Sequence, residues 1–454
     1  MAKAPPVQEH EREKSRRIGA LGELWPFMRP YRALLAAALV MLVATAVVSL
    51  ILPIAVRRVV DNFGVEDGAI LDKYFAAALG IAGLFALGSA LRYALVTRLG
   101  ERVVADIRKA IFDRVIGMSP AFYERLMTGE VLSRITTDTT LILSVIGSSV
   151  SIALRNLLIF IGGLALMLAT SPKLTGLVLL IVPAVVFPIL VLGRRLRTLS
   201  RENQDWIAAS SGNASEALSA VQTVQAFTHE ALSQAEFGRV TEQSFDAARR
   251  RVNTRAVMTA IVIFLVFTGV VGVLWIGARD VRAGGMTPGM LVQFVIYSVM
   301  VAGSVGALSE IWGELQRAAG ATERLVELLR ATDAVQDPET PRALPDPVAG
   351  ALAFEDVHFT YPARPDAQAL DGVSLRVAPG ETIALVGPSG AGKTTIIQLL
   401  LRFYDPAEGR IRLDGVPLDA MRRDAFRRAL ALVPQDPVMF AATARENIRF
   451  GRPE

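Results

Sequence analysis

The stretch LVGPSGAGKTTIIQLL, residues 385–400, decides the fold of the C-terminal part of this 454-residue chain. It continues an apolar run, TIALVG (382–387), that predicts a buried strand, and it ends in a run that predicts a helix. Between the two, Gly387 to Thr394 matches the spacing G-x-x-x-x-G-K-[ST]. A strand, a glycine-rich turn and a helix in this order predict a loop that binds phosphate groups.

The residue types of the loop fit this prediction. Gly390 and Gly392 leave room for backbone N–H groups to turn inward around phosphate oxygens. We expect Lys393 to reach the β- and γ-phosphates, Thr394 to offer its hydroxyl to Mg²⁺, and the helix to add its positive N-terminal end. A glycine-rich turn with a chance lysine is the alternative, but it does not account for the flanking strand and helix patterns. Nucleotide binding is therefore the firmest functional prediction.

Composition predicts more than one domain. With 454 residues, of which 52% are hydrophobic, the chain is too long and too apolar for one ordinary soluble domain. The formal net charge is only +5, so a membrane surface accounts for the basic residues better than a nucleic-acid partner does, and no nucleic acid is expected. The chain has no cysteine, which excludes disulfides, thiolate metal sites and thiol nucleophiles.

Six apolar runs precede the loop. Each is close to the roughly 20 residues that a helix needs to cross a bilayer. A buried helix of a soluble protein would explain any single run, but not six in series. We therefore expect six transmembrane helices, at residues 33–56, 74–96, 152–170, 174–192, 257–277 and 290–308.

The distribution of arginine and lysine predicts the orientation in the membrane. These residues are concentrated in 1–32 and in 193–255, whereas the loop 64–72 has none. Positively charged loops stay in the cytosol, so both ends of the membrane part are expected there. The polar segments 98–140 and 193–255 are expected to be long helices that continue from the membrane into the cytosol. Residues 1–32 lack the pattern of a removable signal peptide and are expected to be a cytosolic leader.

A proline-rich stretch, DPETPRALPDPVAG (337–350), marks a domain boundary near Gly350. Short runs of β type follow it. We expect four parts: a cytosolic leader with a short elbow helix, a transmembrane domain, a linker and a nucleotide-binding segment, at 1–32, 33–330, 331–350 and 351–454.

Two further residues are candidates for the nucleotide site. Tyr361 lies shortly before the loop, where its ring could stack on an adenine base. Packing of a strand-end tyrosine against its own domain is the alternative. Gln435 follows the run ALALVP (429–434), which predicts a strand, and its amide could lie near the metal and the attacking water. Taken alone, Gln435 is better explained as part of a polar turn.

Together these features resemble the ATP-binding cassette (ABC) exporters, in particular bacterial half-transporters similar to lipid A flippases and multidrug exporters of subfamily B type. LWPFMRPYR (24–32) resembles the elbow helix of that family. The segments from Phe122 to Thr140 and from Ser215 to Glu230 resemble its two cytosolic coupling segments. The resemblance implies an all-α, six-helix transmembrane domain of type I exporter kind, followed by an α/β P-loop nucleotide-binding domain that is incomplete in this chain.

The resemblance also implies roles for the site residues, with ATP and Mg²⁺ as cofactors. Tyr361 corresponds to the aromatic residue that stacks on adenine, and Gln435 to the glutamine that links the γ-phosphate and Mg²⁺ to the membrane domain. Lys393 and Gln435 would act in catalysis, and Thr394 and Gln435 at the metal. The Walker A loop corresponds to Gly387, Pro388, Ser389, Gly390, Ala391, Gly392, Lys393, Thr394 and Thr395.

One departure from the family concerns hydrolysis. The family's signature motif, Walker B strand and switch histidine are not present in the 454 residues. Because these groups stabilise the transition state, we expect an ATP-hydrolysing transporter by family but a chain that does not hydrolyse ATP alone. A membrane-anchored ATP-binding sensor or scaffold, or an inactive fragment, stays open as the alternative.

The resemblance implies partners and a setting as well. It predicts a second half-transporter subunit, as a homodimer, in the bacterial inner membrane. It also predicts ATP-driven export or flipping of a lipid-like or amphipathic substrate. Arg92 and Arg155 lie inside apolar runs, where charge is costly, so they indicate either a cavity or an anionic headgroup. Snorkelling from a helix end is equally open.

Overall fold

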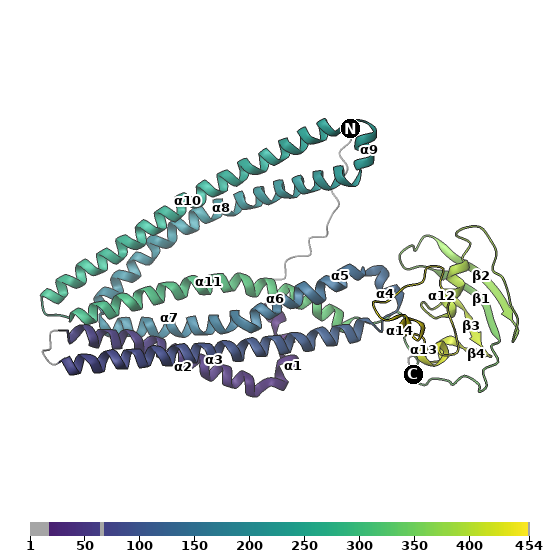
Figure 1. Ribbon diagram of the computed structural model, residues 1–454, viewed down its shortest axis with the longest axis horizontal. Helices are drawn as coiled ribbons and strands as arrows, with labels where there is room; N and C mark the ends of the chain where they lie inside the picture. The colour runs from purple at the N-terminus through teal and green to yellow at the C-terminus, as the bar shows by residue number, and fades with distance from the viewer. Residues whose placement is uncertain (1–17, 64–67, 453–454) are drawn as a thin grey trace. The chain divides into compact units, whose positions relative to one another are not determined.

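The computed structural model describes residues 18–63 and 68–452 (Figure 1). They form two compact units. Among the described residues, the helical unit lies within Pro30–Glu101 and Ser144–Leu315, and the sheet unit comprises 18–29, Arg102–Leu143 and 316–452. The leader up to residue 17 lies outside the described residues, so only its last part, the predicted elbow, can be compared. That part consists of three short helical turns before the first long helix: Ile18–Leu24, α1 (Trp25–Met28) and Arg29–Tyr31.

Six helices among the described residues are long and apolar enough to cross a membrane, which confirms the six predicted spans. Counted with the helical turns that continue them, they contain between 43 and 53 residues, so each extends well beyond the length that a bilayer requires. The helices are α2 (Arg32–Asp61), α3 (Gly68–Val115), α7 (Val150–Thr170), α8 (Pro172–Ser219), α10 (Glu230–Arg282) and α11 (Pro288–Arg330). The predicted long helices are confirmed for most of 193–255, which lies in Pro172–Ser219 and Glu230–Arg282, whereas 98–140 is one helix only as far as Val115 and continues as short helices.

Local sequence explains where these helices begin and end. α8 starts after Ser171, whose side chain accepts a hydrogen bond from the Leu174 backbone N–H, with Pro172 in the first turn. α10 ends just before Gly284, which has a φ of 75° and supplies the left-handed residue that commonly terminates a helix. The short helix α9 (Val221–Ala226) joins α8 to α10.

Within the helical unit, the C-terminal end of α2 is hydrogen-bonded to the N-terminal end of α11. Asp61 accepts hydrogen bonds from the Gly289 backbone N–H at 2.7 Å and from the Thr287 hydroxyl at 2.9 Å. A side chain at Gly289 would meet the Arg57 carbonyl oxygen at 2.4 Å, so only glycine allows this close approach.

Between α3 and α7 the chain makes a turn and a nearly continuous helical path. The path comprises α4 (Pro120–Arg125), α5 (Thr128–Ser133), a π-helical turn (Arg134–Asp138), α6 (Thr139–Ser144) and a second π-helical turn (Val145–Ser149). Within the sheet unit, Arg324 of α11 donates to both carboxylate oxygens of Asp138, at 2.8 and 2.5 Å. Arg134 pairs with Glu130 and Glu327, so charged groups at the first π-helical turn bind it to α11.

The sheet has four antiparallel strands in the order β2-β1-β3-β4. Their bounds are β1 (Leu352–Thr360), β2 (Gln368–Val377), β3 (Glu408–Leu413) and β4 (Val416–Pro417). A bulge at Asp356, with a φ of 49°, shifts the register of β1, so that Phe354, Val357 and Phe359 are all buried. Helix α12 (Lys393–Leu400) packs on this core through Leu399.

Two predicted strands are absent. Residues 382–387 and 429–434 are irregular, and their valines lie in water: Val386 is 88% exposed and Val433 is 93% exposed. A strand has no hydrogen bonds within itself, and no described strand pairs with either segment. The sequence prediction of a strand in these places was therefore wrong for this structure, although the helix after the loop is confirmed as α12.

Candidate nucleotide-binding site

The loop from Gly387 to Thr394 is shaped by glycine. Gly390 and Gly392 have φ values of 85° and 84°, in the region that other residues rarely adopt. A Cβ at Gly392 would lie 2.8 Å from the Ala369 carbonyl oxygen and 2.6 Å from a Leu370 methyl carbon. A Cβ at Gly390 would meet no atom within 4 Å, so there the backbone conformation alone requires glycine.

The functional side chains of the loop lie at the start of α12. The Lys393 Nζ donates to the carbonyl oxygens of Gly387 and Pro388, at 2.9 and 2.7 Å, so its side chain reaches back to the first two residues of the loop. Thr394 is exposed, whereas Thr395 is buried against the sheet. A glycine turn, a lysine ammonium and a helix N-terminus without a side-chain cap are donors that a chain of phosphates requires, so the residues present fit this group.

Tyr361 lies beside the same helix. Its hydroxyl donates to the Gln398 amide oxygen at 2.6 Å and is 2.9 Å from the Thr395 hydroxyl oxygen. Its ring makes edge contacts with Phe359 and Tyr404, with ring centroids 4.9 and 5.4 Å apart. Tyr361 therefore packs against its own domain, which was the alternative that the sequence left open.

Gln435 lies on the irregular segment that follows α13 (Arg423–Arg427) and is exposed. Among the described residues, it makes no hydrogen bond to the loop. The structure thus brings Tyr361 to the helix of the loop and does not bring Gln435 there. Nor do the described residues hold a group of three or more histidine and acidic side chains placed to bind a metal. Magnesium at this loop would depend on phosphate oxygens, water and a hydroxyl oxygen such as that of Thr394.

Comparison with known proteins agrees with this geometry. Residues 35–305 match the family described as the ABC transporter transmembrane region. The chain belongs to the ABC transporters. Residues 370–453, which contain the loop, match a second family described as ABC transporter, and this match implies ATP binding. The chain is thus a multi-pass membrane protein of the exporter type, with six apolar helices and part of a nucleotide-binding domain.

Three relatives illustrate the similarity of this ABC transporter chain. It is 33% identical over 420 residues to the mitochondrial ATP-dependent permease MDL1 of Schizosaccharomyces pombe, covering 91% of this chain and 58% of the permease. It is 31% identical to the mitochondrial ATP-binding cassette sub-family B member 10 of Mus musculus, covering 99% of this chain and 64% of that protein. A putative export ATP-binding/permease protein of Rickettsia bellii is 28% identical, covering 93% of this chain and 74% of the relative. The chain therefore spans less than two thirds of the first two relatives.

Helix α4 docks on the core of the sheet unit. Ala121 is buried in the same apolar cluster as Phe354 and Leu399, and Tyr404 donates its hydroxyl to the Glu124 carboxylate. Burial, together with this carboxylate, raises the pKa of Tyr404 well above its usual range, so the phenol stays a donor at neutral pH. Sequence reasoning did not single out either residue. Glu124 lies within the predicted coupling segment, and Tyr404 lies four residues after the end of α12.

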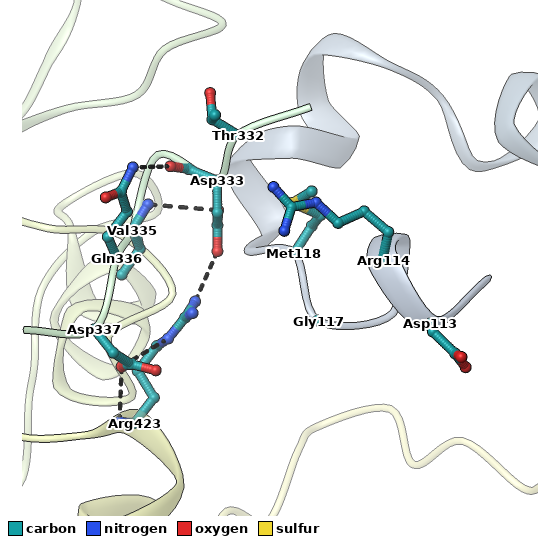
Figure 2. Close-up of a pocket in the computed structure, with 10 residues that line it drawn as sticks. All are labelled: Asp113, Arg114, Gly117, Met118, Thr332, Asp333, Val335, Gln336, Asp337 and Arg423. Carbon is teal, nitrogen blue, oxygen red and sulfur yellow. Dashed lines mark hydrogen bonds and ion pairs between the residues drawn. The ribbon is translucent and has the colours of Figure 1, made fainter. Parts of the chain in front are cut away.

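A second contact of the turn before α4 is centred on Asp333. This carboxylate accepts from the Ser119 backbone N–H at 3.1 Å and from the Arg423 guanidinium at 2.7 Å. Figure 2 shows Asp333 and Asp337 on either side of the Arg423 side chain, at the edge of a cavity of about 520 Å³. The sequence offered no motif for these residues.

Two arginines lie inside the apolar helices of the helical unit. The Arg92 guanidinium donates to the Ser151 hydroxyl at 2.7 Å, and Arg155 follows Ser151 by one helical turn of α7. The Nε atoms of both arginines, and the Ser89 hydroxyl one turn away on α3, are buried without a hydrogen-bond partner in the structure. A set of unsatisfied donors around two like charges is costly unless an anion binds there.

Proposed function

We propose that this chain is one half of a dimeric ABC transporter that uses ATP to export or flip a lipid-like, amphipathic substrate. One observation carries the proposal: helix α12, which follows the phosphate-type loop, and α4, which leads back into the apolar helices, pack on the same core. A nucleotide that reorganises this core therefore has a direct route to the membrane helices.

We assign the nucleotide to the loop and its neighbours. Lys393 would hold the β- and γ-phosphates, with the backbone of Gly387 to Gly392 around them. Tyr361 would stack on adenine, while Thr394 and Gln435 would supply oxygens to Mg²⁺. When bound, Mg²⁺ neutralises charge that develops on the transferred phosphate. The chain's own residues bind and orient the triphosphate.

We also propose the predicted organisation, with parts at 1–32, 33–330, 331–350 and 351–454. The concentration of arginine and lysine supports a cytoplasmic N-terminus and nucleotide-binding segment. The predicted setting is the bacterial inner membrane; the Rickettsia relative is a bacterial export permease, whereas the other two relatives are named as mitochondrial. A second copy of the subunit is the expected partner, because half-transporters of this family typically form dimers and most such assemblies are symmetric.

Arg92 and Arg155 suggest the chemical class of the substrate. Their unsatisfied Nε atoms favour an anionic headgroup over a neutral one. The substrate would then combine a headgroup that contacts these arginines with acyl chains that remain among the apolar helices.

Reconstitution into lipid vesicles tests both parts of the proposal. ATP-dependent movement of a fluorescent anionic phospholipid would be compared with that of a fluorescent zwitterionic one. Arg155→Gln should abolish the preference for the anionic lipid, whereas Arg194→Gln, an exposed change on α8, should not. Absence of ATP-driven movement of either lipid would refute the proposed transport. Movement without a preference, or a preference that survives in Arg155→Gln, would refute the anionic headgroup.

A further inference from the structure

The cavity edge shown in Figure 2 brings three segments of the sheet unit together at one carboxylate. Asp333 belongs to the segment that follows α11. It accepts from Ser119, in the turn before α4, and from Arg423, the first residue of α13. Arg423 also donates its backbone N–H and its Nε to Asp337, at 3.0 and 3.2 Å. Through Asp333 and Arg423, the ends of three elements share one hydrogen-bond network.

The burial of this pair distinguishes it from ordinary surface ion pairs. The side chain of Asp333 is 11% exposed and that of Arg423 is 18% exposed, whereas the neighbouring Arg422–Asp424 pair on α13 is 60% and 54% exposed. Exposed ion pairs such as Arg422–Asp424 contribute little to holding two elements together, because water competes for both charges. Separating a buried pair leaves an uncompensated buried charge, which is strongly unfavourable. The Asp333–Arg423 contact is therefore expected to keep its geometry.

The cavity explains why the segment after α11, the turn before α4 and α13 are connected by polar contacts and not by apolar packing. Its walls include the end of α3, the turn before α4 and the segment after α11, so apolar packing does not fill the space between them. Arg114 of α3, which also lines the cavity, donates to the Ala331 carbonyl oxygen at 2.6 and 3.1 Å. Burial by itself raises the pKa of Asp333, but hydrogen bonds from Ser119 and Arg423 outweigh this effect and hold the pKa below its usual value. The carboxylate is therefore ionised at neutral pH.

We propose that Asp333 is a positioning residue for transport, which makes α4, α13 and the end of α11 move as one body. This inference rests on the proposed ATP-driven transport. From α13 the chain runs directly into the segment that ends at Gln435, and α11 is a single helix back to Pro288. A change at the nucleotide site is thereby passed to α11 as well as to α4.

The absence of cysteine in the 454 residues makes a direct test simple. Spin labels on Met127→Cys, just after α4, and on Ala425→Cys, on α13, report the distance between two exposed positions of the sheet unit. In lipid, we expect a narrow distance distribution in the otherwise unchanged protein and in Asp424→Asn. We expect a broad one in Asp333→Asn and in Arg423→Gln.

Transport supplies the functional readout. In Asp333→Asn, the amount of lipid moved per ATP hydrolysed should fall about five-fold or more, with ATP affinity unchanged. A merely structural role would lower ATP binding and transport together. A narrow distribution in Asp333→Asn overturns the proposal, as does an unchanged ratio of transport to hydrolysis. If the unmodified protein moves no lipid, the proposed transport fails, and the distance distributions still decide whether Asp333 fixes α4 to α13.

Discussion

The hydroxyl of Tyr404 donates to the carboxylate of Glu124, 280 residues earlier in the chain. Tyr404 follows the helix of the phosphate-type loop, and Glu124 belongs to α4. Beside them, Ala121 is buried in the core of the sheet unit. This contact joins the segment that leads to the apolar helices to the segment that we propose holds the nucleotide.

Tyr404→Phe should weaken this contact, because it leaves the Glu124 carboxylate with one donor fewer. In a double-mutant cycle with Glu124→Gln, measured by thermal unfolding in lipid, we expect a coupling of about 1.5–3 kcal/mol. Tyr123→Phe is the matched control. The Tyr123 hydroxyl donates to the Val115 carbonyl oxygen instead, so this change should show no coupling with Glu124→Gln. Equal coupling in both cycles would contradict the role of Tyr404.

The same contact predicts a dependence on alkaline pH. Burial and Glu124 raise the pKa of Tyr404 in the folded protein, so the folded state favours the protonated phenol. The stability that this gives is complete below the unfolded pKa of about 10 and is lost as pH rises towards the higher folded pKa. The melting temperature should therefore fall more steeply above about pH 10 in the unmodified protein than in Tyr404→Phe. Parallel curves would show that the phenol does not titrate in this way.

The two central glycines of the loop should differ when replaced by alanine. Gly390→Ala forces a side chain into a left-handed conformation but meets no atom, and should cost about 1–2 kcal/mol. Gly392→Ala adds a clash with the Ala369 carbonyl oxygen, so its cost should be larger. Thermal unfolding without nucleotide measures both changes. A cost for Gly390→Ala equal to that for Gly392→Ala would contradict the close approach at Gly392.

The Asp138–Arg324 pair is expected to fix the π-helical turn to α11. Asp138→Ala removes a buried carboxylate and should destabilise the protein by about 1–2 kcal/mol, less than a fully buried pair would, because Arg324 still reaches water. The control is Glu236→Ala, which breaks an exposed pair with Arg239 and should have little effect. Thermal unfolding of the two variants side by side makes the comparison. A similarly small effect of both changes would show that the burial of Asp138 does not increase the contribution of its ion pair to stability.

Much of this architecture could be predicted from the sequence because it is local. The six spans follow from runs of apolar residues, and the loop follows from the spacing of Gly387, Gly392 and Lys393. Each of these sequence patterns is contained in a short continuous segment. The long helices over 193–255 were likewise visible in the polar helical pattern of that segment.

The rest could not be predicted, because it depends on residues that are distant in sequence. Strands at 382–387 and 429–434 need neighbours to form, and the described strands do not supply them. The contacts of Glu124 with Tyr404, and of Asp333 with Ser119 and Arg423, arise only when the chain folds. An isolated aspartate or tyrosine gives no sign of such a partner.

Mg²⁺-dependent ATP turnover by the purified protein in lipid vesicles, compared with Lys393→Ala, tests the central claim most directly. ATP binding would be measured in the same samples. We predict that the unmodified protein binds ATP, and that Lys393→Ala loses this binding and any turnover while its membrane insertion is unchanged. Equal ATP binding and turnover in Lys393→Ala, or no ATP binding by the unmodified protein, would contradict the assignment of this loop as the nucleotide site of a transporter.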